Sequence, residues 1–251
     1  MSLRLSGGRR LQSPPGQTAR PTPARVRQAV INMLAPELPG CRWLDLCSGS
    51  GSMACEALQR GAAAVVAIEQ DRRIAVVARR NLEAVLAGLG PRRQPPAQDA
   101  PQRLEGECDP AGATSEAGAT ASVHCSEVLR WLRRGATAGR DSERGFDLIY
   151  ADPPYAAGLY GALAEAVRAG QWLRPEGTLL LECGSAQLPE LPEGWIERDR
   201  RRYGTTTVLR LQLPVSTDGP PEPDRAEPRH QRGQPRLQTA STVKADQPDK
   251  G

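Results

Sequence analysis

Four consecutive residues, Asp152-Pro153-Pro154-Tyr155, join a carboxylate, two rigid backbone positions and an aromatic ring. The prolines fix φ and restrict the residue before each of them, so Asp152 and the carbonyl of Pro153 are held in one orientation. A carboxylate and a carbonyl can accept both N–H hydrogens of an amine on a flat base, and the Tyr155 ring can stack on that base for about 1–3 kcal/mol. The motif predicts a site that positions an exocyclic amine of guanine, adenine or cytosine; a simple loop terminator is the alternative.

A second group of residues, from Asp45 to Gly51, reads as a glycine-containing loop at the start of a helix. Gly49 and Gly51 allow a ligand to approach the backbone closely, because a Cβ would collide with it. An acid about 20 residues further on, after the next strand, suits a ribose diol. Glu69 occupies that place, so the loop predicts a cofactor that contains a nucleoside.

The loop by itself leaves several interpretations open. Gly49-x-Gly51-x-x-Ala54 also matches the dinucleotide fingerprint, so hydride transfer with a nicotinamide cofactor is an alternative, and a purely structural turn is another. The Asp45 carboxylate would repel a pyrophosphate but suits the ammonium of a methionine moiety, which favours S-adenosylmethionine. Glu127 is placed either to accept from an adenine amino group or to serve as an ordinary acid at a helix N-terminus.

Alternating strands and helices must position both groups. Continuous apolar runs predict strands that are covered on both faces, with helices between them, and this pattern indicates a parallel α/β sheet. In such a sheet the loop and the Asp152 motif meet at the carboxyl edge of the strands. The expected strands are 42–47, 64–68, 122–125, 146–151 and 178–183, and the segments 195–197 and 205–213 are expected to close the sheet as a hairpin. The expected helices run from about Pro23 to Leu34, with Thr22 as its cap, from Met53 to Leu58, from Asp71 to about Leu89, from Val128 to Leu132 and beyond, and from about Leu159 to Ala169.

The distribution of charge and the number of cysteines narrow the class of protein further. The first 30 residues hold six arginines and no acid, which suits a polyanion such as nucleic acid, although a solubilising tail is the alternative. The six cysteines form no CxxC pair and there are two histidines, so neither a metal site nor a disulfide framework is expected. With no apolar run long enough to cross a membrane, we expect no membrane association and a location in a reducing cytoplasm.

Composition also divides the chain. Residues 1–38 are expected to form a basic arm and helix that contact nucleic acid, and residues 39–213 the main domain. Residues 91–121 contain five prolines and one large aliphatic residue, which predicts a disordered insertion. Residues 214–251 contain seven prolines and no aromatic residue, and a disordered tail is expected there.

Several motifs together resemble a known family. The segments GGRRLQSPPGQTARPTPARVRQAVINML, LDLCSGSGSMACEALQRGA, VVAIEQDR, DLIYADPPY and RRYGTTTVLRL are similar to those of the RsmD-type bacterial 16S ribosomal RNA guanine-N2 methyltransferases. The resemblance covers about Arg4 to Leu213. The chain departs from the family pattern at Cys47, where Phe is usual, at Ser48, where Ala is usual, at 53–55, and at Glu127, where Asp or Asn is usual.

The resemblance implies a Rossmann-like class I methyltransferase, with a mostly parallel seven-stranded sheet, helices on both faces and a C-terminal antiparallel hairpin. It implies methyl transfer from S-adenosylmethionine to the N2 amine of one guanine in 16S rRNA. The partner would be 16S rRNA, the small ribosomal subunit or an assembly intermediate of it, and the protein would act as a monomer without a metal.

The resemblance also implies roles for individual residues. The methionine end of the cofactor would be lined by Asp45, Ser48, Gly49 and Gly51. Glu69 would hold the ribose and Glu127 the adenine, and the guanine would be received by Asp152, Pro153, Pro154 and Tyr155. RNA phosphates would be bound by Arg9, Arg10, Arg20, Arg25 and Arg27, with bracing of the first helix as the alternative for Arg20 and Arg25.

Two other functions fit the same motifs. A DNA adenine-N6 or cytosine-N4 methyltransferase uses a site of this type, but the chain has no separate target-recognition domain. A non-enzymatic RNA-binding assembly factor could keep the fold, but the intact Asp152, Gly49 and Gly51 argue against it.

Overall fold

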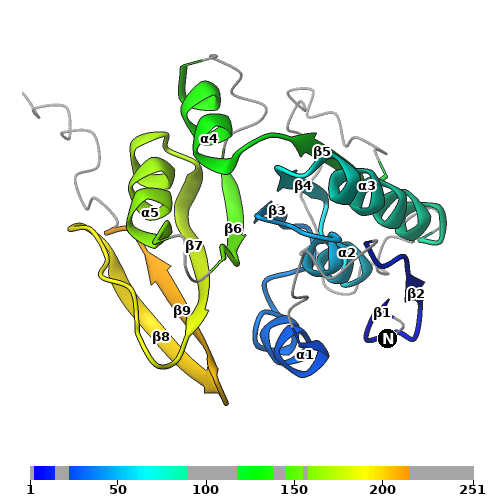
Figure 1. Ribbon diagram of the computed structural model, residues 1–251, viewed down its shortest axis with the longest axis horizontal. Helices are drawn as coiled ribbons and strands as arrows, with labels where there is room; N and C mark the ends of the chain where they lie inside the picture. Colours follow the sequence, from blue (N-terminus) through cyan, green and yellow to red (C-terminus); the bar gives the residue numbers. More distant parts are fainter. Residues whose placement is uncertain (1–2, 15–22, 90–117, 138–144, 155–157, 215–251) are drawn as a thin grey trace, which may run out of the picture. The chain divides into compact units, whose positions relative to one another are not determined.

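The computed structural model describes residues 3–14, 23–89, 118–137, 145–154 and 158–214. Helices and strands alternate along most of these ranges (Figure 1). The helices are α1 (Ala24–Met33), α2 (Ser52–Gln59), α3 (Arg72–Ala87), α4 (Val128–Thr137) and α5 (Tyr160–Ala169). The strands are β1 (Leu3–Arg4), β2 (Arg10–Leu11), β3 (Arg42–Leu46), β4 (Ala64–Glu69), β5 (Thr120–Cys125), β6 (Phe146–Ala151), β7 (Leu173–Gly184), β8 (Ile196–Tyr203) and β9 (Thr206–Gln212).

In the described part of the chain, seven strands form one sheet in the order β5-β4-β3-β6-β7-β9-β8. The strands from β5 to β7 are parallel, and β9 and β8 complete the sheet as an antiparallel pair. The chain leaves β3 toward β4 on one side and returns to β6 on the other side. The carboxyl ends of β3 and β6 therefore flank the point where the strand order reverses, which is where open α/β sheets bind ligands.

Each face of the sheet is apolar because successive side chains of a strand point to opposite faces. On one face Trp43, Leu148 and Leu180 pack in a cluster with side chains of α1, α2 and α3. On the other face Leu44, Ile149 and Leu179 pack with side chains of α4 and α5. Both faces are thus covered by helices, and the expected Rossmann-like α/β fold with a C-terminal antiparallel hairpin is confirmed (Figure 1).

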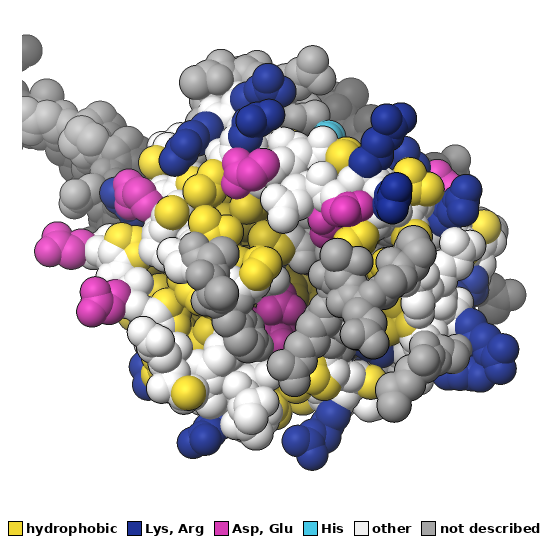
Figure 2. Space-filling model, viewed as in Figure 1, with side chains coloured by type: hydrophobic (Ala, Val, Ile, Leu, Met, Phe, Trp, Pro, Cys, Tyr) yellow, Lys and Arg dark blue, Asp and Glu magenta, His cyan; other side chains and the backbone are white. Residues whose placement is uncertain are grey.

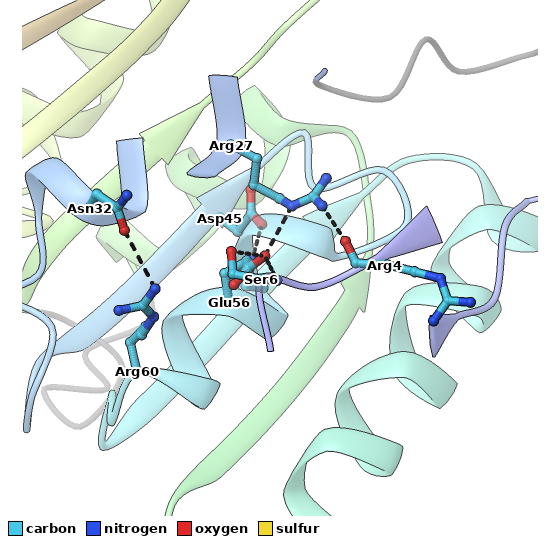
Figure 3. A network of polar contacts seen from close by, with 8 residues as sticks. Arg4, Ser6, Arg27, Asn32, Asp45, Glu56 and Arg60 are labelled. Atoms are coloured by element: carbon cyan, nitrogen blue, oxygen red, sulfur yellow. Dashed lines mark hydrogen bonds and ion pairs between the residues drawn. The ribbon is translucent and has the colours of Figure 1, made fainter. Parts of the chain in front are cut away.

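The N-terminal hairpin of β1 and β2 is part of the first cluster, through Leu5 and Leu11. Polar contacts fix it to the helices: the backbone N–H and the hydroxyl of Ser6 donate to Glu56 of α2 at 2.8 and 3.0 Å. Arg27 of α1 donates to the same Glu56 oxygen at 3.2 Å and to the carbonyl of Arg4 (Figure 3). Arg27 and Glu56 are 3% and 0% exposed, so the pair is a buried one that joins α1, α2 and the hairpin.

Some elements differ from their predicted bounds. β7 begins at Leu173 rather than Thr178, because Leu173 already pairs with Phe146, and a register shift with Glu176 at a φ of 64° separates this pair from the one between Leu148 and Thr178. β8 runs for eight residues where three were expected. β5 begins at Thr120, inside the range predicted as an insertion, and α1 begins at Ala24 with Pro23 at its N-cap. The residues 90–117 and 215–251, which hold most of the two segments predicted to be disordered, lie outside the described ranges.

None of the helices in the described ranges combines the length and the apolar character needed to span a bilayer.

Candidate active site

The loop between β3 and α2 turns sharply enough to need left-handed backbone conformations. Cys47, Gly49 and Gly51 have φ values of 64°, 54° and 73°. The turn is fixed by Ser48 N–H, which donates to the carbonyl of Ile68 at 2.8 Å, and by Gly51 N–H, which donates to the carbonyl of Ser48 at 2.8 Å. The loop is therefore rigid at the carboxyl edge of the sheet.

The side chain of Asn81 in α3 ties this loop to the N-terminal segment. Its amide nitrogen donates to the carbonyls of Ser50 and Gln12, each at 3.0 Å, and its oxygen accepts from Gln12 N–H at 2.8 Å. Asn81 is 2% exposed, so these bonds lie inside the protein. The carboxyl ends of β3 and β4, the glycine loop and the N-terminal segment are thus joined by hydrogen bonds.

The two glycines of the loop have different surroundings. A Cβ on Gly51 would lie 3.3 Å from the Cβ and 3.4 Å from the Cα of Ala78 in α3, whereas a Cβ on Gly49 would meet nothing within 4 Å. Gly51 is needed for packing as well as for its positive φ, and Gly49 faces open space that a ligand can occupy.

We expect Gly51→Ala to lower the free energy of unfolding by roughly 1–3 kcal/mol, since it adds a close contact to the strain of a positive φ. Gly49→Ala carries only the strain, so a loss of about 1 kcal/mol or less is expected, together with weaker ligand binding. Urea denaturation of the two variants measures the difference. Equal losses would show that contact with Ala78 does not matter.

Glu69, at the end of β4, is held by backbone amides on both sides. One carboxylate oxygen accepts from Gly49 N–H at 2.9 Å and the other from Asp71 N–H at 2.8 Å. Burial raises the pKa of Glu69, while these amides oppose the rise. Each oxygen of a carboxylate has further acceptor capacity, so both remain able to bind hydroxyl groups. Glu69 lies against the glycine loop, as its sequence position predicted.

Asp45 lies beneath the loop and is 2% exposed. Its carboxylate accepts from Ala54 N–H in α2 at 3.1 Å. Burial raises the pKa of Asp45 well above its ordinary value. The hydrogen bond from Ala54 N–H lowers this pKa, and the negative charges of Asp152 and Glu69 raise it further. Carboxylates from three strand ends therefore act on each other within one region.

Asp152 follows the last residue of β6 and is half-buried. Ala151 pairs with Leu46 of β3 on one side and Leu181 of β7 on the other, so Asp152 lies next to the start of the glycine loop. Pro153 is buried and Pro154 is exposed, and Tyr155 lies outside the described residues. The structure thus brings Asp152 and the loop residues to one sheet edge, as predicted.

A second pair of residues below Asp152 was missed in the sequence. The hydroxyl of Tyr150 in β6 donates to Glu182 in β7, and both side chains are 1% exposed. Burial, with the charge of Asp152, raises the pKa of Glu182 from 4.5 to about 8. The signal in the sequence was an acid inside the apolar run Thr178–Cys183, where a lone charge is costly without a partner.

The raised pKa of Glu182 predicts a pH dependence of stability. Between pH 4.5 and about 8 the unfolded chain has released this proton while the folded chain still holds it. The free energy of unfolding therefore falls as the pH rises through this window, and the whole cost is present above pH 8. Glu182→Gln keeps an acceptor for Tyr150 and removes the titration, so we expect it to be more stable than the unmodified protein at high pH, by on the order of 3 kcal/mol.

Urea denaturation at pH 5 and pH 8.5 provides the measurement, because the gain should nearly vanish at the lower pH. Glu176→Gln, at an exposed position of the same strand, is the matched control and should leave the pH dependence unchanged. An identical pH slope for Glu182→Gln and the unmodified protein would contradict the assignment.

The side chains of Ser48 and Glu127, two predicted cofactor contacts, differ in their hydrogen bonding. The hydroxyl of Ser48 is buried and, among the described residues, has no hydrogen-bond partner. A buried polar group without a partner is costly, so a bound ligand that supplies one would be favoured. The carboxylate of Glu127, by contrast, caps α4 by accepting from Leu129 and Arg130 N–H at 2.9 and 2.8 Å. Capping of a helix N-terminus is the alternative role considered for Glu127, and its contact with adenine stays a prediction.

Figure 2 shows an acidic side chain recessed in the middle of the viewed face, with Arg side chains and further acidic side chains around its periphery. Within the described ranges, no group of three or more His, Cys, Asp and Glu side chains could hold a metal ion.

The arginines predicted to bind RNA have different environments. Arg9 donates to the carbonyl of Ala84 at 2.8 Å, Arg10 and Arg25 are exposed, and Arg20 lies outside the described residues. The prediction was wrong for Arg27, because it is buried in its ion pair with Glu56.

Comparisons with known proteins agree with this architecture. The family model described as "Conserved hypothetical protein 95" matches residues 5–109 and 118–212. The "Ribosomal RNA small subunit methyltransferase D" of Escherichia coli (strain K12) is 27% identical over 189 residues, 75% of this chain and 76% of that protein. The protein of the same name from Haemophilus influenzae is 24% identical over 188 residues, 75% of this chain and 80% of that protein.

Solved structures share the fold. The Escherichia coli protein yhhF superposes with a TM-score of 0.62 at 23% identity, covering 86% of this chain and 99% of that one. A hypothetical protein of Thermus thermophilus, TTHA0928, gives a TM-score of 0.60 at 24% identity, covering 84% and 99%. Because the family model matches most of the chain, including the glycine loop and the Asp152 motif, the chain belongs to this family, the RsmD-type methyltransferases.

Proposed function

We propose that the protein transfers a methyl group from S-adenosylmethionine to the exocyclic N2 amine of a guanine in 16S rRNA, in the cytoplasm. Membership of the family supports methylation of ribosomal RNA. The choice of guanine N2 and of this cofactor is inferred from the site. The substrate would be the RNA itself, the small subunit or an assembly intermediate.

The observation that carries the proposal is the convergence of three acidic side chains at the carboxyl ends of β3, β4 and β6: Asp45, Glu69 and Asp152. Negative charge repels the pyrophosphate of a dinucleotide, and attracts a cofactor whose sulfonium and ammonium are both positive. The same charge suits an amine that becomes positive during the reaction. The site therefore favours methyl transfer to nitrogen over hydride transfer.

The residues around the glycine loop fit S-adenosylmethionine. The open space at Gly49 admits a ligand next to the backbone, and the unpaired hydroxyl of Ser48 can bond to it. Glu69 would hold the ribose hydroxyls, and Asp45 would face the methionine end together with Gly51. When bound, S-adenosylmethionine supplies a methyl group activated by the sulfonium.

The residues after β6 would act on the guanine. Asp152 and the carbonyl of Pro153 would accept the two N–H hydrogens of the N2 amine and hold its nitrogen toward the methyl group, while Pro154 keeps the turn rigid. Orientation of this kind contributes up to roughly 7–11 kcal/mol to lowering a barrier. The nitrogen becomes acidic as it gains the methyl group, and Asp152 or a water can then accept its proton. Tyr155 would stack on the base, which must be unpaired or extruded from its helix.

Glu69 provides a test of the cofactor assignment. Glu69→Gln keeps the size of the side chain and weakens acceptance from two hydroxyls, so we expect about a tenfold higher dissociation constant for S-adenosylmethionine by calorimetry. Glu83→Gln, on the outward side of α3, is the control and should bind normally. Equal affinities would remove Glu69 from the ribose site.

The function itself is tested by incubating the protein with labelled S-adenosylmethionine and naked 16S rRNA, partly assembled small subunits, whole small subunits or DNA, followed by nucleoside analysis. Label in N2-methylguanosine is the expected result. Label in N6-methyladenine or N4-methylcytosine of DNA would instead establish the alternative enzyme. Absence of label in every substrate, with normal cofactor binding, would leave the assembly-factor function.

A further inference from the structure

The turn between β8 and β9 lies at the same edge of the sheet as the candidate active site. β9 is antiparallel to β7, and Gly184 at the carboxyl end of β7 pairs with Thr206 at the start of β9. The turn is tied to the segment after β7, since Ser185 N–H donates to the carbonyl of Thr205 at 2.8 Å and the hydroxyls of Ser185 and Thr207 are 2.8 Å apart. The position of this turn relative to Glu182 and Asp152 is therefore fixed.

Two arginines from distant parts of the sequence meet at this turn. Arg202, near the end of β8, donates through Nε to the carbonyl of Gly204 at 3.0 Å. The guanidinium of Arg25, in the first turn of α1, lies 3.8 Å from the position that a Cβ on Gly204 would take. Both side chains are exposed, and within the described ranges neither forms an ion pair with an acid. Both cations thus lie against Gly204 without an acid in the described part of the chain to pair with, and this arrangement favours a bound anion.

The other arginines of β8 do not share this arrangement. Arg200 and Arg201 form ion pairs with Glu197 and Asp199, each at 2.7 Å. Arg198 bonds to Gln212, at the end of the strand pair that is far from the turn. Charged side chains on an edge strand commonly serve only to prevent pairing with other chains, and that explanation suffices for these three residues.

The candidate active site is acidic and the turn between β8 and β9 is basic, which suits an RNA substrate with a neutral base and charged phosphates. The crevice holds acids and would repel phosphates, so a nucleotide can enter it base-first only if its backbone is held outside by cations. The turn lies two to three strand positions from β6, which is roughly 10–15 Å at about 4.8 Å per strand. We propose that Arg25 and Arg202 bind RNA phosphates next to the nucleotide whose base enters the crevice. This inference rests on the proposed function, because it assigns a second contact of the same substrate.

Neutralising variants of the full-length chain test the proposal. Arg25→Gln and Arg202→Gln each remove one cation at the turn, and Arg198→Gln is the matched control on the same strand. Binding to 16S rRNA and to small ribosomal subunits is measured by filter binding at several KCl concentrations, with Km and kcat for methyl transfer measured in parallel. For each of the first two variants we expect a dissociation constant about five- to tenfold higher at low salt, and a plot of log Kd against log [KCl] that is shallower by about 0.7–0.9.

The two variants should raise Km for the RNA and leave kcat at saturating RNA near that of the unmodified protein, since neither residue contacts the reacting atoms. Arg198→Gln should match the unmodified protein in every measurement. If Arg25→Gln and Arg202→Gln bind RNA with the affinity and salt slope of Arg198→Gln, the proposal is overturned while the proposed methylation stands. If the unmodified protein binds RNA with these arginines contributing but transfers no methyl group to it, the phosphate contact stands and the proposed function fails.

Discussion

Asp152→Ala is expected to lower kcat for methyl transfer by at least about 10³-fold, while the affinity for S-adenosylmethionine changes little. Loss of a group that positions and stabilises the reacting centre commonly costs on the order of 10²–10³ in rate, and here the same side chain would also orient the amine. Asp152 is half-buried at the end of β6, so its removal leaves no cavity in the core of the sheet.

The measurement combines single-turnover methyl transfer with calorimetric titration of the cofactor. Asp147→Asn, at the opposite end of β6, is the matched control, because Asp147 bonds to Arg174 and to Arg42 N–H and lies far from the site. The control should retain full methyl transfer once it is folded. Turnover of Asp152→Ala within tenfold of the unmodified protein would remove Asp152 from the chemistry.

The largest effect on stability is expected from the buried ion pair. Arg27→Met leaves the Glu56 carboxylate buried and without its cation, and breaking such a pair from one side commonly costs about 3–5 kcal/mol. For a domain of this size that corresponds to a fall in Tm of roughly 6–20 °C. The hairpin of β1 and β2 should loosen as well, since Arg27 also donates to the carbonyl of Arg4.

Two further variants separate the charge effect from packing. Arg210→Met removes the cation from the partly exposed pair with Glu37, and we expect a loss of about 1 kcal/mol or less. The double variant Arg27→Met, Glu56→Gln should recover much of the loss, because no buried charge remains. Urea denaturation measures all of these. A cost for Arg27→Met no larger than that for Arg210→Met would contradict the role of burial.

The central strands could be predicted because they are apolar on both faces. β6 has the predicted bounds, and β3 and β4 differ from theirs by one residue at one end. β8 could not be predicted to its full length, because an edge strand has one exposed side and its charged residues show no apolar run. The two-residue strands β1 and β2 are too short for any pattern, and their position depends on contacts with α1 and α2.

Burial of individual charges was harder to predict than the fold. Arg27 belongs to a run of arginines that reads as a surface arm, yet it lies three and four residues before Val30 and Ile31, on the face of α1 that is buried. Glu56 and Glu182 stand inside apolar segments in the same way. Such acids signal either a cation or a hydroxyl partner, but the partner comes from a distant segment and only the folded chain identifies it.

The sheet ends at β8, and this edge has a consequence for behaviour at high concentration. Pairing of two such edges would bring the guanidinium groups of Arg198 and Arg202 from both molecules together and strip them of water. That repulsion opposes aggregation by strand addition, which a bare apolar edge would invite. At high protein concentration the edge should therefore stay unpaired.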